Sequence, residues 1–570
     1  MLERIPPGLI LVVGALLLPL LRGRLRQLWF VALPVLGLAQ LVVLADGSWG
    51  HVLLFGCPLT VVRLDALSRF FGVVFHLAAL LGAVYALHVR GAVEQVAAMV
   101  YAGAAVGAVC AGDLVTLFAC WELAAVSSAV LVWARGTEQS YAAGMRYLLV
   151  QVTSGVLLLA GVVAHYAATG SLAFGHLGVP GQGDLGVTLI FIAFGIKAAF
   201  PLLHAWLKDA YPEATPAGTV FLSAFTTKMA VYALARGFAG VDLLVPIGAA
   251  MVVFPVFYAM TEDDLRRLLS YSLNSQLGFM VVGVGVGTPL ALNGAVSHAA
   301  ASTVYQSLLF MAAGAVVVHA GTGSARALGG LYSSLRGVAW CALVGAAAIS
   351  ALPLTSGFAT KSLTLSAVAE GHWDRTWLVL LLGAGAAFVH TGLRFPYLAF
   401  CRGAAPLPAG AGAPLPGGML VAMALSALLT VAIGVFPHLL YGMLPYPVEY
   451  EPYTASHVLG QLELMGFGLL LFALAARRGW LPRPHGNLLD ADWVYRALLP
   501  RLARGALAVV RPGRQSLVAG SRRLLELGAG YVHEHHAPGG LFARTWGTAS
   551  SVLIVVALLA VYLLYFLHGG

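Results

Sequence analysis

The chain has little charge and little cysteine. Charged residues make up 10% of its 570 residues and hydrophobic residues 60%, and the mean hydropathy is +0.88. This composition lies outside the range of soluble domains and predicts a membrane protein. The five cysteines lack the CxxC spacing of zinc and iron–sulfur sites, so we expect neither a metal nor a redox cofactor.

Lysine is scarcer still. Four lysines stand against 28 arginines, and three of them, Lys197, Lys228 and Lys361, lie inside apolar stretches. Arginine stays charged when buried, whereas lysine can lose its proton. An ionisable side chain at membrane depth is costly and usually marks an ion or proton path. This partition between the two basic residues predicts a membrane protein that moves protons.

Apolar segments of about 20 residues, the length of a membrane span, recur along the chain. They predict an all-α polytopic membrane protein with about 16 transmembrane helices. The first is interpreted as a span and not as a removed signal peptide, because no small-residue cleavage site follows it. The segments are 8–21, 28–45, 68–88, 95–111, 113–133, 143–167, 187–207, 216–238, 243–260, 271–288, 291–319, 338–369, 376–400, 418–441, 456–476 and 549–567.

The charge of the connecting loops predicts the orientation. Loops after odd-numbered segments carry arginines such as Arg22, Arg90 and Arg135, whereas the loop 442–456 is acidic. The positive-inside rule then makes the odd-numbered loops cytoplasmic and both termini external. We expect a bacterial plasma (inner) membrane location. The net charge of +9 is attributed to this orientation and to contact with the lipid bilayer, and no nucleic-acid partner is expected.

Proline interrupts two of the lysine-bearing segments. Pro201 follows Lys197, and Pro353 and Gly357 precede Lys361. Proline removes a backbone donor and breaks or kinks a helix. Paired broken helices indicate inverted repeats with a site at mid-membrane, so we expect two inverted five-helix repeats, each containing one broken helix.

This organisation divides the chain into six regions. They are N-terminal membrane helices (1–94), a first repeat (95–240), a second, inverted repeat (241–402), C-terminal membrane helices (403–476), a cytoplasmic basic amphipathic segment (477–547) and a final membrane helix (548–570).

Two further residues complete a predicted proton path. Glu122 is a carboxylate near the middle of an apolar segment, so it is expected to meet Lys197 or Lys228; a static ion pair that fixes helix packing is the alternative. His298 shares a helix face with Ser302 and Tyr305. It is interpreted either as a proton relay or as a hydrogen-bonded interhelical histidine.

Several stretches resemble a known family. DLVTLFACWEL, FGIKAAFPLLHAWLKDAYPEATPAG, HAAASTVYQSLLFMAAG and LPLTSGFATKSL are similar to the proton-translocating antiporter-like subunits of Mrp sodium/proton antiporters and respiratory complex I. HTGLRFPYLAF and LLDADWVYR make the D-type Mrp subunits the most similar members. The resemblance implies proton-translocating roles for the predicted residues: Glu122, Lys197, Lys228, His298 and Lys361.

Two features depart from the family. Gln306, which cannot titrate, stands where many relatives carry a lysine. The tail after residue 497 adds an arginine-rich amphipathic segment, split at Pro512–Gly513, which is expected to lie on the membrane surface or along a partner subunit.

The favoured function is therefore a proton-translocating subunit of a multisubunit cation/proton antiporter, with sodium as the favoured cation and other membrane subunits as partners. The alternatives are a membrane-arm subunit of a complex I-like or hydrogenase-like redox complex, a subunit that couples proton flux to inorganic-carbon uptake, and a scaffold without transport. The sequence contains no catalytic or redox-cofactor motif, so membership of an NADH:quinone oxidoreductase-type enzyme complex stays open.

Overall fold

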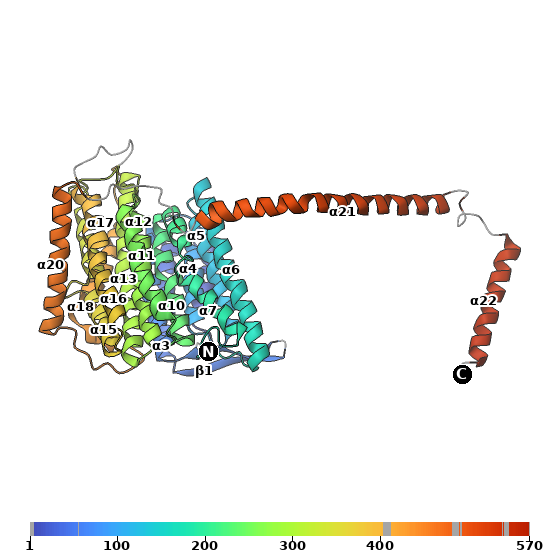
Figure 1. The fold of residues 1–570 in the computed structure, drawn as a ribbon, viewed down its shortest axis with the longest axis horizontal. Coiled ribbons are helices and arrows are strands. Elements are labelled where there is room, and N and C mark those ends of the chain that lie inside the picture. The colour runs from blue at the N-terminus through green and yellow to red at the C-terminus, as the bar shows by residue number, and fades with distance from the viewer. Residues whose placement is uncertain are drawn as a thin grey trace. The chain divides into compact units, whose positions relative to one another are not determined.

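The computed structural model describes residues 5–54, 56–402, 412–480, 490, 493–537, 540 and 547–568. They form two compact units, Met1–Ala491 and Asp492–Gly570, and each is described by itself. In the first unit the helices pack side by side, and the chain passes across the bundle from α6 (Glu138–Thr169) through α13 (Pro289–Ala320) to α20 (Ala455–Arg477) (Figure 1).

Most of the described chain is helical, and twelve helices are long and apolar enough to cross a membrane. The predicted all-α polytopic membrane protein is confirmed at this level. Besides α6, α13 and α20, the spans are α2 (Gly23–Val43), α3 (Ala66–Tyr85), α4 (Ala92–Val109), α5 (Leu114–Trp133), α9 (Pro216–Ala224) with α10 (Thr226–Gly237), α11 (Leu244–Thr261), α16 (Asp374–Ala387) with its continuation, α18 (Gly417–Val435) and α22 (Thr548–His568).

The remaining predicted segments are also helical. Three contain shorter apolar helices, and the fourth, 271–288, falls in a polar-faced helix whose first turn carries Arg266 and Arg267. These helices are α1 (Leu9–Ala15), α7 (Leu185–Lys197), α14 (Arg336–Ile349) and α12 (Leu265–Val286).

A β-hairpin stands between α2 and α3. Strands β1 (Gly47–Leu54) and β2 (Cys57–Leu64) pair antiparallel, from Gly47 opposite Leu64 to Leu54 opposite Cys57. Leu59, Val62 and Leu64 of β2 are buried. The all-α prediction omits this hairpin, because a short run of β-branched and apolar residues between two long spans resembles a loop in the sequence.

Both predicted helix breaks are present. The α7 helix ends at Lys197 and the short α8 (Ala205–Ala210) follows, whereas α14 ends at Ile349 and α15 (Ser356–Glu370) follows. Each break holds two non-glycine residues in the left-handed region of backbone space. They are Ala199 (φ 59°) and Leu202 (φ 69°) in the first, and Ala351 (φ 56°) and Leu354 (φ 70°) in the second. Such residues are strained and persist only where the surrounding structure holds them, which is typical of functional sites.

A third break, at Phe225, separates α9 from α10, so the predicted single helix over 216–238 is wrong in this detail. The backbone N–H of Thr226 donates to the Tyr101 hydroxyl of α4 at 2.8 Å instead of to a helix carbonyl. An inserted side chain can interrupt a helix without proline. The break therefore depends on a residue far away in the sequence.

The α16 helix also departs from regular geometry. It continues as a π-helical turn (Phe388–Leu393), the single turn α17 (Arg394–Pro396) and a second π-helical stretch (Tyr397–Cys401). π-Turns frequently mark functional sites, and this one contains the buried His390.

The second unit contains a π-turn (Val494–Leu498), α21 (Leu499–His536) and α22. The predicted split at Pro512–Gly513 is wrong, because α21 is one helix of 38 residues. A proline costs a helix one backbone hydrogen bond and bends it, but the bonds on either side can keep it continuous. Parts of the predicted segment 477–547, namely 481–489, 491–492, 538–539 and 541–546, lie outside the described residues.

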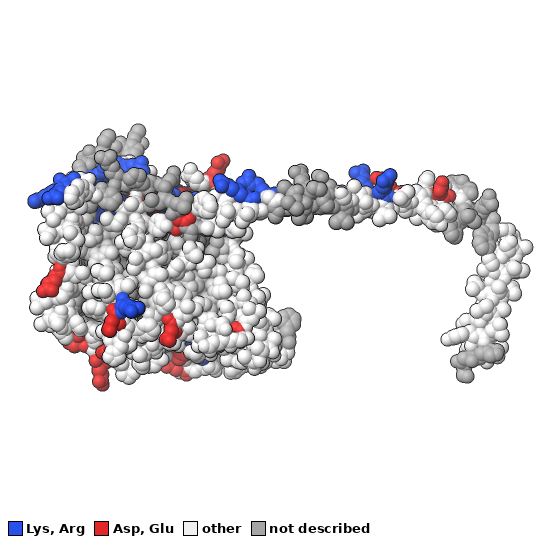
Figure 2. Space-filling model, in the orientation of Figure 1, with Lys and Arg blue, Asp and Glu red and all other residues white. Residues whose placement is uncertain are grey.

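Charge is unevenly distributed over the first unit. In Figure 2 most of its visible Lys and Arg side chains lie at the end of the bundle where α12 and α17 are labelled in Figure 1, and several Asp and Glu side chains lie at the opposite end. This distribution accords with the alternation of basic and acidic loops.

The second break generates a stability prediction. A Cβ added at Gly357 would stand 1.8 Å from the carbonyl oxygen of Ala348, so backbone would have to move. We expect Gly357→Ala to lower the melting temperature of the purified protein by several degrees, since overpacking costs about 1–3 kcal/mol. The control is Gly466→Ala in α20, where an added Cβ meets no atom within 4 Å. Equal melting temperatures for the two variants would contradict the tight approach of α14 and α15.

Candidate functional site

The first buried lysine lies at the end of a broken helix. Lys197 is the last residue of α7 and is 1% exposed. Its Nζ donates to the carbonyl oxygen of Trp121 in α5 at 2.7 Å and lies 4.4 Å from the centre of the Trp121 ring. Both contacts stabilise an ammonium group removed from water.

Glu122 adjoins this contact, and α6 makes room for it. A Cβ at Gly155 would stand 1.6 Å from the Glu122 Oε1 atom, so the carboxylate occupies space that only glycine leaves. Oε1 is buried without a hydrogen-bond partner in the described chain, and no ion pair within 4 Å joins Glu122 to a described lysine. Lys197, and not Lys228, therefore lies next to Glu122. Its ammonium donates to the carbonyl oxygen of Trp121, the residue before Glu122, and not to the Glu122 carboxylate.

The second lysine faces the third helix break. Lys228 of α10 is fully buried, and its Nζ donates to the carbonyl oxygen of Ser223 at 2.7 Å. Ser223 lies in the last turn of α9. Its hydroxyl is 3.5 Å from that of Ser307, so this site adjoins α13.

The third lysine forms a hydrogen bond across the second predicted break. Lys361 of α15 is 1% exposed, and its Nζ donates to the carbonyl oxygen of Ile349, the last residue of α14, at 2.6 Å. The ammonium also lies 5.0 Å from the centre of the Phe279 ring.

The three lysines share one arrangement. Each ammonium donates to a backbone carbonyl beside a helix break. The acceptor lies at the end of α9 for Lys228 and at the end of α14 for Lys361, whereas Lys197, the last residue of α7, donates to the Trp121 carbonyl within α5. The last carbonyls of a helix have no partner within the helix and carry partial negative charge. The α9 and α14 half-helices therefore each supply a fixed dipole that favours the charged lysine.

His298 connects α13 to the third lysine. Its Nδ1 atom is 3.0 Å from the Thr360 hydroxyl, one residue before Lys361, and its Nε2 atom is 3.4 Å from the Tyr305 hydroxyl. The predicted shared face of His298 and Tyr305 is confirmed. Gln306 instead donates to the carbonyl oxygen of Leu269 at 3.0 Å.

Buried polar atoms without a described hydrogen-bond partner lie along the same region. Such atoms are rare in folded proteins and usually bind ordered water. They occur on helices from both halves of the bundle: Glu122 Oε1, the Gln151 amide, Thr227 Oγ1, the Asn274 amide, Gln276 Nε2, Ser302 Oγ, Gln306 Oε1, Ser356 Oγ and His390 Nε2.

His390 is a candidate that the sequence analysis missed. It is fully buried in the π-turn, with Nδ1 2.6 Å from the Thr391 hydroxyl, which in turn donates to Ser272 of α12. The residues before His390 are apolar and contain no proline. The available signal in the sequence was a histidine inside an apolar segment, four residues before Arg394.

A second missed group is a carboxylate outside the spans. Asp490 lies 3.2 Å from His204 Nε2 and 2.8 Å from Lys208 Nζ, and it accepts from the Tyr271 hydroxyl at 2.7 Å. Burial opposes its ionisation, but hydrogen bonds and positive charge from His204 and Lys208 hold the pKa of the Asp490 carboxyl well below its usual value. The chain after α20 is thereby attached beside the first broken helix.

Within the described ranges, no three His, Cys, Asp or Glu side chains lie close enough together to hold a metal ion.

The site can now be compared with known proteins. Residues 111–388, which carry all three buried lysines, match the transmembrane model of the NADH:quinone oxidoreductase/Mrp antiporter family. The predicted resemblance is confirmed. The match covers α5 through α16, including all three breaks.

Similar curated proteins include a subunit of a sodium/proton antiporter and a component of a hydrogenase. The chain is 29% identical over 296 residues to the D subunit of the Na(+)/H(+) antiporter of Alkalihalophilus pseudofirmus, covering 49% of this chain and 60% of that protein. It is 27% identical over 417 residues to hydrogenase-4 component B of Escherichia coli, covering 65% and 62%. The chain thus matches about three-fifths of the length of these relatives.

Solved structures show the same fold. A chain of the Mrp complex from Dietzia sp. DQ12-45-1b superposes with a TM-score of 0.69 at 22% identity, covering 83% of this chain and 99% of that one. A chain of an archaeal membrane-bound sulfane sulfur reductase gives 0.70 at 22% identity, covering 97% and 100%.

The Asp490 contacts generate a prediction. Asp490→Asn removes the charge that pairs with the Lys208 ammonium, a change that typically costs about 3–5 kcal/mol at buried pairs. We expect a lower melting temperature at pH 7, with Asp374→Asn, an exposed residue at the start of α16, as the control.

The effect of pH on this variant follows from the lowered pKa. A depressed pKa contributes stability above the unfolded value of about 3.9 and loses it as the pH falls towards the folded value. The difference between Asp490→Asn and the native chain should therefore stay constant from pH 8 to about pH 5. A difference that disappears above pH 6 would contradict the ion pairs.

Proposed function

We propose that the chain is the proton-translocating subunit of a multisubunit cation/proton antiporter, with sodium as the favoured cation. The observation that carries this proposal is the placement of three buried ammonium groups, each on a backbone carbonyl and each beside a helix break. Lysine, unlike arginine, can be charged there and still release a proton, and a buried position in a membrane protein excludes a merely solubilising role.

The proposed path runs from Lys197 through Lys228 and His298 to Lys361. Lys197 and Lys361 belong to different broken helices. The Lys228 site adjoins α13, and His298 lies on α13. Ordered water at the unpartnered polar atoms would connect groups that are not in direct contact. Gln306 can orient such water but cannot carry the proton itself.

Glu122 is proposed to control the first lysine. Its carboxylate is close enough to the Lys197 ammonium for their charges to interact, yet the two do not form a described ion pair. A small movement of the Glu122 carboxylate towards Lys197 would stabilise the ammonium, and a small movement away would favour release of its proton towards Lys228. The unpartnered Oε1 atom against Gly155 leaves the carboxylate without a fixed hydrogen bond.

We also propose that all sixteen helical segments cross the membrane and that the two halves are inverted repeats. The pairs of left-handed residues occur in the same order around Pro201 and Pro353. Two isolated bridges, Asp113 with Ala173 and Asp264 with Ser324, recur with the same relation to α5 and α12. The six predicted regions, the external termini and the bacterial inner membrane are part of this proposal.

The energy source is proposed to lie on partner subunits, since the sequence carries no nucleotide or redox motif. Other membrane subunits of a hetero-oligomeric complex and the lipid bilayer are the proposed partners. A complex I-like or hydrogenase-like redox complex is the second candidate, favoured by the similarity to hydrogenase-4 component B and by the sulfane sulfur reductase fold.

Removal of the Glu122 charge tests the first half of the path. In membrane vesicles from cells that co-express the neighbouring genes, Glu122→Gln should lower sodium-dependent proton transport at least tenfold, because the amide cannot stabilise the Lys197 ammonium. Glu138→Gln, at an exposed residue in the first turn of α6, is the matched control. The protein level in the membrane is measured in parallel. Normal transport by Glu122→Gln would remove this carboxylate from the mechanism.

Substitution of the terminal lysine tests the second half. Lys361→Ala should abolish transport in the same vesicles, whereas Lys361→Glu should retain a measurable fraction, because a carboxylate also titrates. The measurement is the initial rate of proton movement per amount of membrane-inserted protein. Identical losses for the two variants would argue that the ammonium–carbonyl contact, and not titration, is what transport requires.

A further inference from the structure

A cavity of about 570 Å³ reaches Lys361 from the side of α20. It lies between α15, α16 and α20. Most of its wall is apolar, but it also contains hydroxyl, amide, imidazole and carboxylate groups. The polar lining residues are Lys361, Ser362, Ser366, Ser456, His457, Gln461 and Glu463.

The α20 wall of this cavity is fixed to the second broken helix. Gln461 Nε2 donates to the carbonyl oxygen of Ser350 at 2.9 Å, just past the end of α14. This carbonyl is next to that of Ile349, which holds the Lys361 ammonium. The break that holds the lysine therefore also positions the facing wall.

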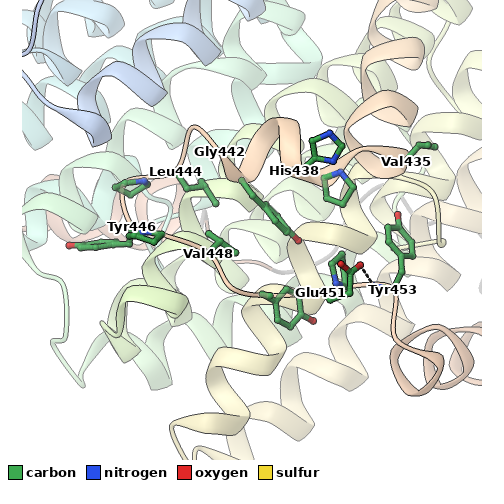
Figure 3. Close-up of a pocket in the computed structure, with 14 residues that line it drawn as sticks. Val435, His438, Gly442, Leu444, Tyr446, Val448, Glu451 and Tyr453 are labelled. Atoms are coloured by element: carbon green, nitrogen blue, oxygen red, sulfur yellow. Dashed lines mark hydrogen bonds between the residues drawn. The ribbon is translucent and has the colours of Figure 1, made fainter.

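A second cavity, of about 750 Å³, lies within the loop between α18 and α20. It is lined by residues 435–453, including the short helix α19 (Pro437–Tyr441), and Figure 3 shows His438 and Glu451 among the side chains around it. This is the acidic loop of the sequence. The Tyr441 hydroxyl donates to the carbonyl oxygen of Ala359 at 2.9 Å, which attaches the loop to α15.

Tyr450 joins the two cavities. It lines the loop cavity, and its hydroxyl accepts a hydrogen bond from Ser366 at 3.1 Å and lies 3.3 Å from His457 Nδ1. Ser366 and His457 both line the cavity that contains Lys361. Contacts of Tyr450 thus link the cavity that contains the buried lysine to the cavity that contains Glu451.

Charge on α20 supports the same interpretation. Glu463 lies in the interior of this span, and no described ion pair within 4 Å neutralises it. A carboxylate at membrane depth is costly unless it contacts water or a partner charge. The cavity beside Glu463, whose wall includes several polar groups, can supply that water.

We propose that the proton leaves Lys361 through these cavities, with His457 of α20 as the relay. The Lys361 ammonium loses the proton, the His457 imidazole gains it, either directly or through water, and the imidazole then returns to its neutral form by passing the proton beyond Tyr450 to Glu451 or water. No electrons move in this sequence. The inference rests on the proposed function, because it assigns the release side of the same path.

Transport by His457→Gln in the complete complex tests the relay. Glutamine keeps hydrogen-bonding capacity but cannot titrate, so transport should fall at least tenfold, while His176→Gln, at an exposed histidine that lines neither cavity, should transport normally. Lys361→Ala is measured alongside. Normal transport by His457→Gln with loss in Lys361→Ala would overturn the relay alone, whereas normal transport by Lys361→Ala would overturn the proposed function.

Thiol labelling gives a readout that does not depend on transport. In a background whose five native cysteines are replaced by serine, Ser366→Cys should react with a charged, membrane-impermeant thiol reagent applied at the acidic end. Ser128→Cys, at a fully buried serine, should not react. Absence of labelling at Ser366→Cys, in a protein that inserts normally, would show that the cavity is not open to water and would overturn this exit.

Discussion

The contact between a buried ammonium and the last carbonyls of a half-helix is the interaction on which the architecture depends. A charge in the interior of a membrane protein is costly, and a free helix carbonyl in the same place is costly as well. Lys361 on Ile349 and Lys228 on Ser223 satisfy both groups at once. At these two breaks the lysine and the free carbonyl therefore stabilise each other.

The α13 helix transmits this arrangement from one half to the other. It is buried along nearly all of its length, and it carries Ser307 near the Lys228 site and His298 near the Lys361 site. Because the two sites share this helix, a change in charge at one site can alter the packing and the hydrogen bonds of the other.

Local chemistry decided which features could be predicted. Pro201 and Pro353 indicated their breaks from the sequence, and the scarcity of lysine identified the three buried lysines without knowledge of the fold, although proline does not break α2 or α11. The break at Phe225 could not be predicted, since it depends on the Tyr101 hydroxyl of another helix. The attachment of Asp490 beside His204 is likewise a tertiary contact between distant segments. The β-hairpin was not predicted, because its strands are short and resemble a loop between two spans. The α21 helix stays continuous across a proline, because a long helix tolerates the loss of one hydrogen bond.

Replacement of Lys228 by arginine tests the central claim most directly, namely that the buried lysines act by losing a proton and not merely by being positive. Arginine keeps the charge but does not release its proton under physiological conditions. The chain offers its own control in Lys208, which pairs with Asp490 outside the proposed path. We expect Lys228→Arg to insert normally but to lose proton transport, while Lys208→Arg transports like the native chain. Equal transport by both variants would show that a fixed positive charge suffices and that Lys228 does not act by losing a proton.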